Sequence, residues 1–231
     1  MVPAFDPIIF GCRILSVIKD NLVHLFGLLD HKLLPPLLER ESGPMRSRQR
    51  TNAEAAGTLR TLVKDQKIFS EGQAANFFYK VATGVVRTYT ILEDGRRQIT
   101  GFHLEGDILG LEAGSRHRFS ASGLCDVTVI AFKRSDLNLL LATDTAFRAE
   151  ILSSLLASLE HAQNQVLLMG RKSAREKVAQ FLLDLAHRAS KSKTSDLPMR
   201  RSDIADFLGM SRETASRALT QRTCDGVIRT K

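Results

Sequence analysis

Cysteine is scarce in this chain, and no long apolar run is free of charged residues. The three cysteines, Cys12, Cys125 and Cys224, are far apart and odd in number, which excludes a CxxC metal knuckle and a disulfide framework. The apolar stretch of residues 5–38 is interrupted by charges such as Arg13 and so cannot supply the roughly 20 apolar residues of a membrane helix. It also lacks the pattern of a secretion signal. We therefore expect a cytoplasmic protein without membrane association.

Patterns that carry catalysis are missing as well. The sequence contains no P-loop, no metal-ligand spacing and no recognisable set of nucleophile, base and acid. Its six histidines have no partners that spacing could assign. The sequence therefore predicts a protein that is not an enzyme and that holds neither a metal nor a cofactor.

The formal net charge of +8 is unevenly distributed. Residues 171–231 contain 14 Lys and Arg against 7 Asp and Glu, so this third of the chain carries most of the excess. A basic segment indicates a polyanionic partner, although a merely well-charged, soluble surface would give the same composition. The charge becomes informative only beside a motif.

The N-terminal half divides into two regions. Residues 1–50 are predicted to be an extension of unknown role that ends in a polar, helix-breaking linker. In residues 51–143, short β-like runs alternate with glycines at intervals of 11 or 12 residues: Gly72, Gly84, Gly95 and Gly106. Such regular turn signals are typical of an antiparallel barrel or jelly roll, because each strand must be followed by a reversal that tolerates a positive φ. Asp94-Gly95 predicts a type I′ hairpin turn.

The period becomes helical in residues 144–172. Apolar residues recur there at spacings of 3 and 4 and form an uncharged stripe, called the seam below: Leu152, Leu155, Leu159, Ala162, Val166 and Met169. Either an intramolecular core helix or a dimerisation helix produces this pattern, so the stripe alone leaves both open. A second helix is predicted over residues 174–189.

Residues 202–221 have the layout of a helix-turn-helix within residues 173–231. Ser202 is predicted to cap a first helix that buries Ile204, Ala205 and Leu208. Gly209 is expected to supply the left-handed backbone of the turn.

The second helix of this motif is predicted to begin at Ser211, whose hydroxyl can accept a bond from a free N–H. Its inward residues are expected to be Ala215, Ala218 and Leu219. The opposite side carries polar and charged residues that complete the predicted DNA-binding set: Arg212, Glu213, Ser216 and Arg217, with Ser211, Arg200 and Arg201 beside them.

Three of these side chains lie on one helix face, because Ser216 and Arg217 follow Glu213 by three and four residues. In a major groove, arginine can bind guanine O6 and N7, glutamate can accept from a cytosine or adenine amino group, and serine can contact a thymine methyl or an acceptor. An ordinary surface helix with a solvated Glu213–Arg217 pair is the simpler alternative.

At these residues the chain resembles the Crp/Fnr family of bacterial transcription regulators, over about residues 58–229. Residues 213–217 are similar to the E-x-x-S-R recognition signature of the Fnr-like branch, and residues 99–108 look like that branch's central barrel strands. Residues 110–121 are similar to FixK-type proteins. The resemblance implies an α+β fold: an N-terminal double-stranded β-helix (jelly roll) like that of cyclic-nucleotide-binding domains, a long dimerisation helix and a C-terminal winged helix-turn-helix.

The resemblance also implies function and partners. We expect a homodimer that binds an inverted repeat of TTGA-like half-sites in double-stranded DNA, about 34 Å apart between centres. An activator that recruits RNA polymerase, in low-oxygen or nitrogen-fixation control, is implied. Arg212 departs from a FixK-type helix and leaves the outer base preference open.

The signals of related sensors are absent from the sequence. Where cyclic-nucleotide binders carry Gly-Glu and Arg-Ser, this chain has Gly110-Leu111 and Phe119-Ser120, so no cyclic nucleotide is expected. Cys12 stands alone where Fnr proteins cluster cysteines for an iron–sulfur centre. Haem ligation by His103 or His117 is the weaker interpretation of two isolated histidines.

Two features near the C-terminus carry hypotheses of their own. Cys224 follows the second helix in a basic setting that favours oxidation, which would weaken DNA binding; an incidental small residue is the alternative. The sequence stops soon after Asp225-Gly226, so the wing is expected to be truncated. Two rival functions remain: an effector-gated regulator that senses cyclic nucleotide, haem or redox state, and a sensor or scaffold module with impaired DNA binding.

Overall fold

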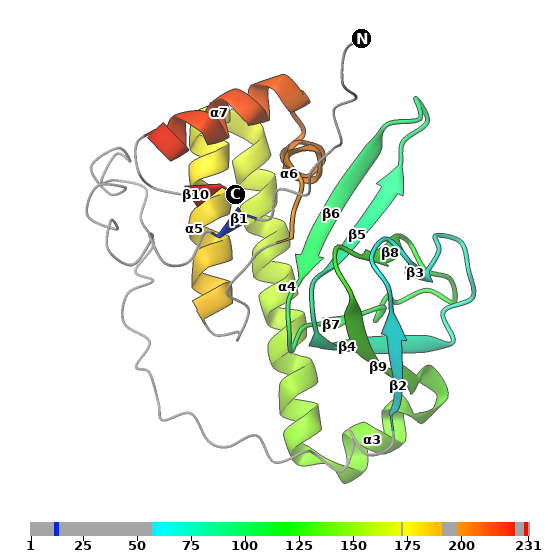
Figure 1. The fold of residues 1–231 in the computed structure, drawn as a ribbon. Coiled ribbons are helices and arrows are strands. Elements are labelled where there is room, and N and C mark those ends of the chain that lie inside the picture. Colours follow the sequence, from blue (N-terminus) through cyan, green and yellow to red (C-terminus); the bar gives the residue numbers. More distant parts are fainter. Residues whose placement is uncertain (1–11, 14–56, 172, 191–197, 225–228, 231) are drawn as a thin grey trace.

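The computed structural model describes residues 12–13, 57–171, 173–190, 198–224 and 229–230. Two four-stranded antiparallel sheets face each other (Figure 1). The first has the order β2-β9-β4-β7: Thr58–Leu62, Val127–Lys133, Phe77–Thr83 and Ile108–Leu109. The second has the order β3-β8-β5-β6: Lys67–Phe69, Ser120–Gly123, Val86–Ile91 and Arg97–His103. This is the jelly roll that the glycine spacing predicted.

The predicted turn glycines all have left-handed backbones, with φ between +77° at Gly72 and +93° at Gly106. The type I′ turn predicted at Asp94-Gly95 is wrong. That turn needs a positive φ at both central residues, and only Gly95 has one. The hairpin closes instead through a bond from Leu92 N to Arg96 O (2.8 Å), with Gly95 N donating to Leu92 O (2.9 Å). A three-residue loop with glycine in the left-handed position satisfies the backbone without straining Asp94.

The C-terminal half is helical. A short turn, η2 (Arg134–Asp136), and α3 (Leu137–Thr143) lead into the 27-residue helix α4, Thr145–Arg171. Three further helices follow: α5, Ala174–Ser190; α6, Arg201–Leu208; and α7, Arg212–Cys224. The helices from α4 to α7 match the helical segments read from the sequence, whereas α3 lies in the region assigned to the β-roll.

The two ends of the chain meet in one pair of short strands. β1, Cys12–Arg13, pairs antiparallel with β10, Arg229–Thr230. The expected wing truncation and the role of the N-terminal extension otherwise lie outside the described residues, and the predicted domain boundaries stay predictions.

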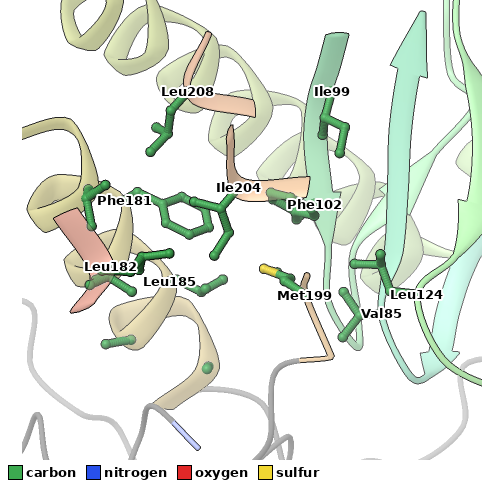
Figure 2. Close-up of a cluster of buried hydrophobic side chains, with 14 of the residues drawn as sticks. Val85, Ile99, Phe102, Leu124, Phe181, Leu182, Leu185, Met199, Ile204 and Leu208 are labelled. Atoms are coloured by element: carbon green, nitrogen blue, oxygen red, sulfur yellow. The ribbon is translucent and has the colours of Figure 1, made fainter. Parts of the chain in front are cut away.

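Three buried apolar clusters hold the described part of the chain together. Two lie in the barrel: one between its sheets, which includes Val81 and Val129, and one under α3 and the start of α4. In the latter, Phe78 stacks on Phe132 and the Phe147 ring packs against both at a tilt. The third, called the interdomain cluster, joins barrel strands to α5, α6 and α7 (Figure 2). Its members include Val85, Ile99, Phe102, Leu124, Phe181, Leu182, Leu185, Met199, Ile204, Leu208 and Leu219.

Candidate nucleic-acid interface

The first helix of the predicted motif, α6, begins two residues earlier than a cap at Ser202 implies and has a different cap. Ser202 lies inside the helix, and the backbone N–H of Arg200 donates instead to Asp203 Oδ2 (3.1 Å). An acidic residue in the first turn can satisfy a free N–H just as a serine before the helix does. The predicted buried residues Ile204, Ala205 and Leu208 are confirmed.

The turn and the second helix follow the prediction closely. Gly209 has φ +60° and ends α6, and its backbone would bring a Cβ within 3.3 Å of the Met169 sulfur. Ser211 Oγ accepts from Thr214 N (3.1 Å), which confirms the predicted cap of α7. The small residues Ala215 and Ala218 are buried, so α6 and α7 can cross closely.

The outer face of α7 is open to solvent on the side away from α6. Arg212, Glu213 and Arg217 are exposed, and Ser216 is partly buried. The structure therefore brings Glu213, Ser216 and Arg217 to one surface, as the spacing predicted. Two donors and one acceptor at helical spacing can meet base edges in a groove.

Arg201 contacts the second helix of the motif, and its predicted part in DNA binding stays a prediction. Its Nη1 donates to Ser216 Oγ (2.6 Å) and to Thr220 Oγ1 (3.3 Å), so it bridges α6 and α7. Ser216 keeps its own O–H free to donate, because the hydroxyl oxygen is the acceptor in this bond. Arg201 thus orients Ser216 in this structure.

Arg200 lies apart from the outer face of α7. It is exposed, and its guanidinium Nη2 lies 3.9 Å from Oδ2 of Asp65 of the barrel. The predicted set therefore splits into an α7 group and a residue directed toward the barrel.

A hollow between the start of α5 and α7 adds residues that the sequence did not single out. It is lined by Arg175, Thr214, Arg217, Gln221 and Cys224, among others. Arg175 and Cys224 are exposed there. Only the packing of α5 against α7 places Arg175 beside Arg217, so no local spacing could have found it.

The seam on α4 is exposed along most of its length. Leu155 is 46% exposed, Leu159 56% and Val166 73%, whereas Met169 is partly buried near Gly209. Leu152 and Ala162 are exposed too. No described residue covers most of the seam, so the choice between an intramolecular and a dimer contact stays a prediction.

The helix-turn-helix is tied to the barrel by charged side chains that sequence reasoning missed. Asp203 of α6 is 1% exposed, and its Oδ1 lies 3.0 Å from Arg87 Nη1 and 2.6 Å from Arg97 Nη2. Arg97 also contacts Asp206 Oδ2 at 2.7 Å, and Arg87 Nη2 lies 2.7 Å from Asp65 Oδ1. We call these five residues the Asp203 network.

Electrostatics favour the charged form of the arginine at the edge of this network. Burial lowers the pKa of Arg97, but its hydrogen bond to Asp206 and the negative charges of Asp203 and Asp206 outweigh that effect and raise the pKa above the usual value. Gln98 adds a neutral link by donating to the Asp206 carbonyl oxygen (2.6 Å) at the end of α6.

Comparison with known proteins decides the family. Residues 176–231 match the Crp-like helix-turn-helix domain, and residues 59–144 match the cyclic nucleotide-binding domain. The nitrogen fixation regulation protein FixK of Azorhizobium caulinodans is 41% identical over 179 residues, which cover 75% of this chain and 72% of that protein. The chain belongs to the Crp/Fnr family.

Other Crp/Fnr relatives agree with this assignment. The transcriptional activatory protein AadR of Rhodopseudomonas palustris is 42% identical over 160 residues, 68% of this chain and 67% of AadR. The solved structure of FixK2 from Bradyrhizobium japonicum has a TM-score of 0.66 and 42% identity, covering 74% of this chain and 86% of that one. The chain is thus a Crp/Fnr-type transcription regulator homologous to FixK.

In this Crp/Fnr chain, side chains of the loop that follows Gly110 pack inward and bond within the loop and to the barrel. His117 is buried, stacks on Phe69 with ring centroids 3.8 Å apart, and places Nδ1 3.0 Å from Glu112 Oε2. Arg134 donates to the backbone oxygens of Glu112 and Gly114. Ser120 Oγ accepts from Glu71 N (3.0 Å), so its oxygen is engaged within the barrel.

The other histidine considered in the sequence, His103, lies where β6 faces the helices. Its Nε2 is 3.2 Å from Thr88 Oγ1. Desolvation lowers its pKa to about 4; Asp107 acts in the opposite direction, and Arg188 and His161 add to the lowering.

Among the described residues, no group of three or more His, Cys, Asp or Glu could hold a metal ion, and no helix is long and apolar enough to cross a membrane.

Proposed function

We propose that the protein is a homodimeric, sequence-specific DNA-binding regulator that reads an inverted repeat through the outer face of α7. The single observation that carries the proposal is the set of Glu213, Ser216 and Arg217, presented together on one exposed surface of a Crp-like helix-turn-helix. Arg217 is assigned to guanine O6 and N7, Glu213 to an amino group and Ser216 to an acceptor or a thymine methyl. Arg212 and Arg175 lie at the edge of that surface, where phosphates would pass.

The seam supports the dimer. Its exposed leucines and valine carry no charge and repeat at the spacing of a two-helix interface. A two-fold pairing of α4 would present two copies of α7 to successive major grooves, about 34 Å apart along the duplex. The site would then be an inverted repeat, and the family resemblance implies TTGA-like half-sites.

The biological role is inferred from the relatives. FixK proteins are named as nitrogen fixation regulators and AadR as a transcriptional activatory protein. We infer by homology an activator that contacts RNA polymerase in the cytoplasm, in low-oxygen or nitrogen-fixation control. No enzymatic activity is assigned.

The filled loop around His117 supports control without a cyclic nucleotide. Glu112 and Arg134 are engaged with the loop itself, and Leu111 and Phe119 stand where nucleotide binders carry charged residues. Activity would then follow protein abundance or the oxidation state of Cys224, which is exposed beside Arg217 in the hollow.

The direct test is selection of bound sequences from a random pool of duplex DNA at a fixed salt concentration, because phosphate contacts make affinity salt-dependent. We expect an inverted repeat to be recovered. Recovery of unrelated sequences would contradict sequence-specific recognition.

The assignment of Arg217 has its own test. Arg217→Ala is expected to weaken binding to the selected site by about 1–3 kcal/mol, while binding to random DNA changes little. Arg118→Ala removes the same charge from an exposed position on the barrel and serves as the matched control. Equal losses on selected and random DNA would show that Arg217 contacts phosphate only.

A further inference from the structure

We propose that Asp203 is a positioning residue whose carboxylate fixes the helix-turn-helix against the barrel and thereby sets the half-site spacing that the dimer accepts. The inference rests on the proposed function, since spacing has meaning only for a dimer that binds two half-sites. Asp203 itself faces the barrel and contacts no DNA in this scheme.

The carboxylate of Asp203 is fully engaged across two domains. Oδ1 accepts from Arg87 Nη1 and Arg97 Nη2, which come from neighbouring strands β5 and β6. Oδ2 accepts from the N–H of Arg200 at the start of α6. One buried side chain therefore caps α6 and joins it to residues more than 100 positions away in the sequence.

Both arginines are themselves held in place within the barrel. Arg87 Nε donates to Ser122 Oγ (3.0 Å) of β8, and both guanidinium carbons lie about 6 Å from the centroid of the Tyr89 ring. Asp65 completes the set from a left-handed backbone with φ +63°, the one positive φ among the described non-glycine residues. Backbone strain retained at such a contact indicates that the surrounding structure fixes it.

Directional contacts matter here because most of the remaining buried contact between the barrel and the helices is apolar; the exceptions are the bonds of Gln98 and Arg188. Phe102, Phe181 and Phe207 from β6, α5 and α6 pack as tilted ring pairs with centroids 5.2–5.9 Å apart. Apolar contacts supply affinity but depend weakly on register, whereas short ion pairs with fixed geometry specify one arrangement. The interdomain cluster holds α6 on the barrel, and the Asp203 network specifies the position of α6 relative to β5 and β6.

The docked position leaves the reading surface free. α6 lies between the β5–β6 hairpin and the other helices, while α7 lies across the upper ends of α4 and α5 (Figure 1). A dimer paired through α4 would fix the two barrels relative to each other. The distance between the two α7 helices would then depend on how each α6 sits on its own barrel.

The test compares Asp203→Asn with Asp94→Asn on inverted repeats whose spacer is changed by one base pair in either direction. Asparagine keeps one oxygen for Arg200 N, but it removes the charge and replaces the oxygen that accepts from Arg87 and Arg97 by an NH2 group that can only donate. Asp94 is the matched control, because it makes an exposed ion pair with Arg96 on the same hairpin (2.7 Å) outside the Asp203 network.

The parent and Asp94→Asn are expected to bind the repeat with the preferred spacer about tenfold or more tightly than the repeats with a changed spacer. For Asp203→Asn this difference in affinity should be less than about threefold, while its affinity for an isolated half-site stays unchanged. An unchanged spacing preference in Asp203→Asn would overturn the proposal. If Asp203→Asn fails to fold, Arg97→Gln carries the same test, since it leaves the Arg87–Asp203 pair in place.

A second readout separates this inference from the proposed function. Amide hydrogen exchange in α6 and β6 is expected to accelerate in Asp203→Asn and to stay unchanged in Asp94→Asn, with no DNA present. If the parent binds no DNA at any spacing, the proposed function fails and the spacing claim fails with it. Unchanged exchange in α6 would remove the docking role as well.

Discussion

Two apolar surfaces of this molecule have similar composition and opposite environments. Phe181 of the interdomain cluster is 5% exposed and contacts the barrel and α6, whereas Leu155 and Leu159 of the seam are roughly half exposed. Both belong to amphipathic helices with residues at spacings of 3 and 4. The difference teaches that helical periodicity identifies an apolar face but does not say whether the same chain or a second copy covers it.

The largest expected effect comes from truncating each surface in turn. Phe181→Ala should lower the free energy of unfolding by about 3–5 kcal/mol, because it opens a cavity among Phe102 and Phe207. The loss of stability caused by Leu159→Ala should depend on protein concentration, since in the proposed dimer Leu159 is covered by the second copy of the chain. Denaturant unfolding at two concentrations about 100-fold apart measures both. A concentration-independent loss at Leu159 would break the comparison.

Charge placed on the seam should separate the dimer without unfolding the chain. Leu155→Glu would bury two carboxylates in the paired state, so the dimer should dissociate at least about 100-fold more readily, or about 2.7 kcal/mol. Sedimentation and DNA binding measure the two consequences. Ala157→Glu, exposed two positions further along α4, is the control and should stay dimeric. Unchanged sedimentation of Leu155→Glu would place the interface elsewhere.

Acid should weaken the contact between barrel and helices through His103. Its pKa in the folded protein is about 4, below the ordinary 6.5, so between those values the unfolded chain binds the proton first. Stability is therefore unaffected above pH 6.5 and falls as the pH decreases toward 4, by up to about 1.4 kcal/mol per pH unit. His103→Gln should flatten this slope in pH-dependent unfolding, whereas His187→Gln, at an exposed site, serves as control.

The smallest expected effect is a loss of DNA affinity when the exposed Cys224 is oxidised. Peroxide treatment of the parent should weaken specific DNA binding by about tenfold, because an oxidised sulfur at Cys224 places bulk or negative charge near phosphate. Cys224→Ser should resist the treatment, and Cys125→Ser should behave as the parent does. If Cys224→Ser loses binding as readily as the parent, the cysteine is an incidental residue.

Local signals explain why much of the helix-turn-helix could be predicted. The left-handed turn at Gly209, the cap at Ser211 and the buried Ala215 each depend on neighbours within a few residues. The errors were local as well: Asp203 replaced Ser202 as the cap acceptor, and Asp94-Gly95 formed a longer loop. In both cases two geometries suit the same residues, and small differences in free energy choose between them.

For the predicted DNA-binding set, the sequence indicated which residues share a helix face but not which neighbours their side chains contact, because side-chain direction depends on tertiary packing. Spacing alone placed Glu213, Ser216 and Arg217 on one face. It could not show that Arg201 bridges to Ser216, or that Arg175 of another helix joins the same surface. A basic residue near a motif has several acceptors within reach, and only the packed structure selects one.

The sequence by itself determined the β-roll, the long helix, the helix-turn-helix and the Crp/Fnr resemblance, since strand alternation, helical period, turn glycines and caps act over a few residues. Only the tertiary structure decided that Asp203 meets Arg87 and Arg97, that the seam stays uncovered by the described chain and that the interdomain cluster unites barrel and helices. Those contacts join residues distant in sequence, where burial and charge pairing are set by the global packing and leave no periodic trace in the chain.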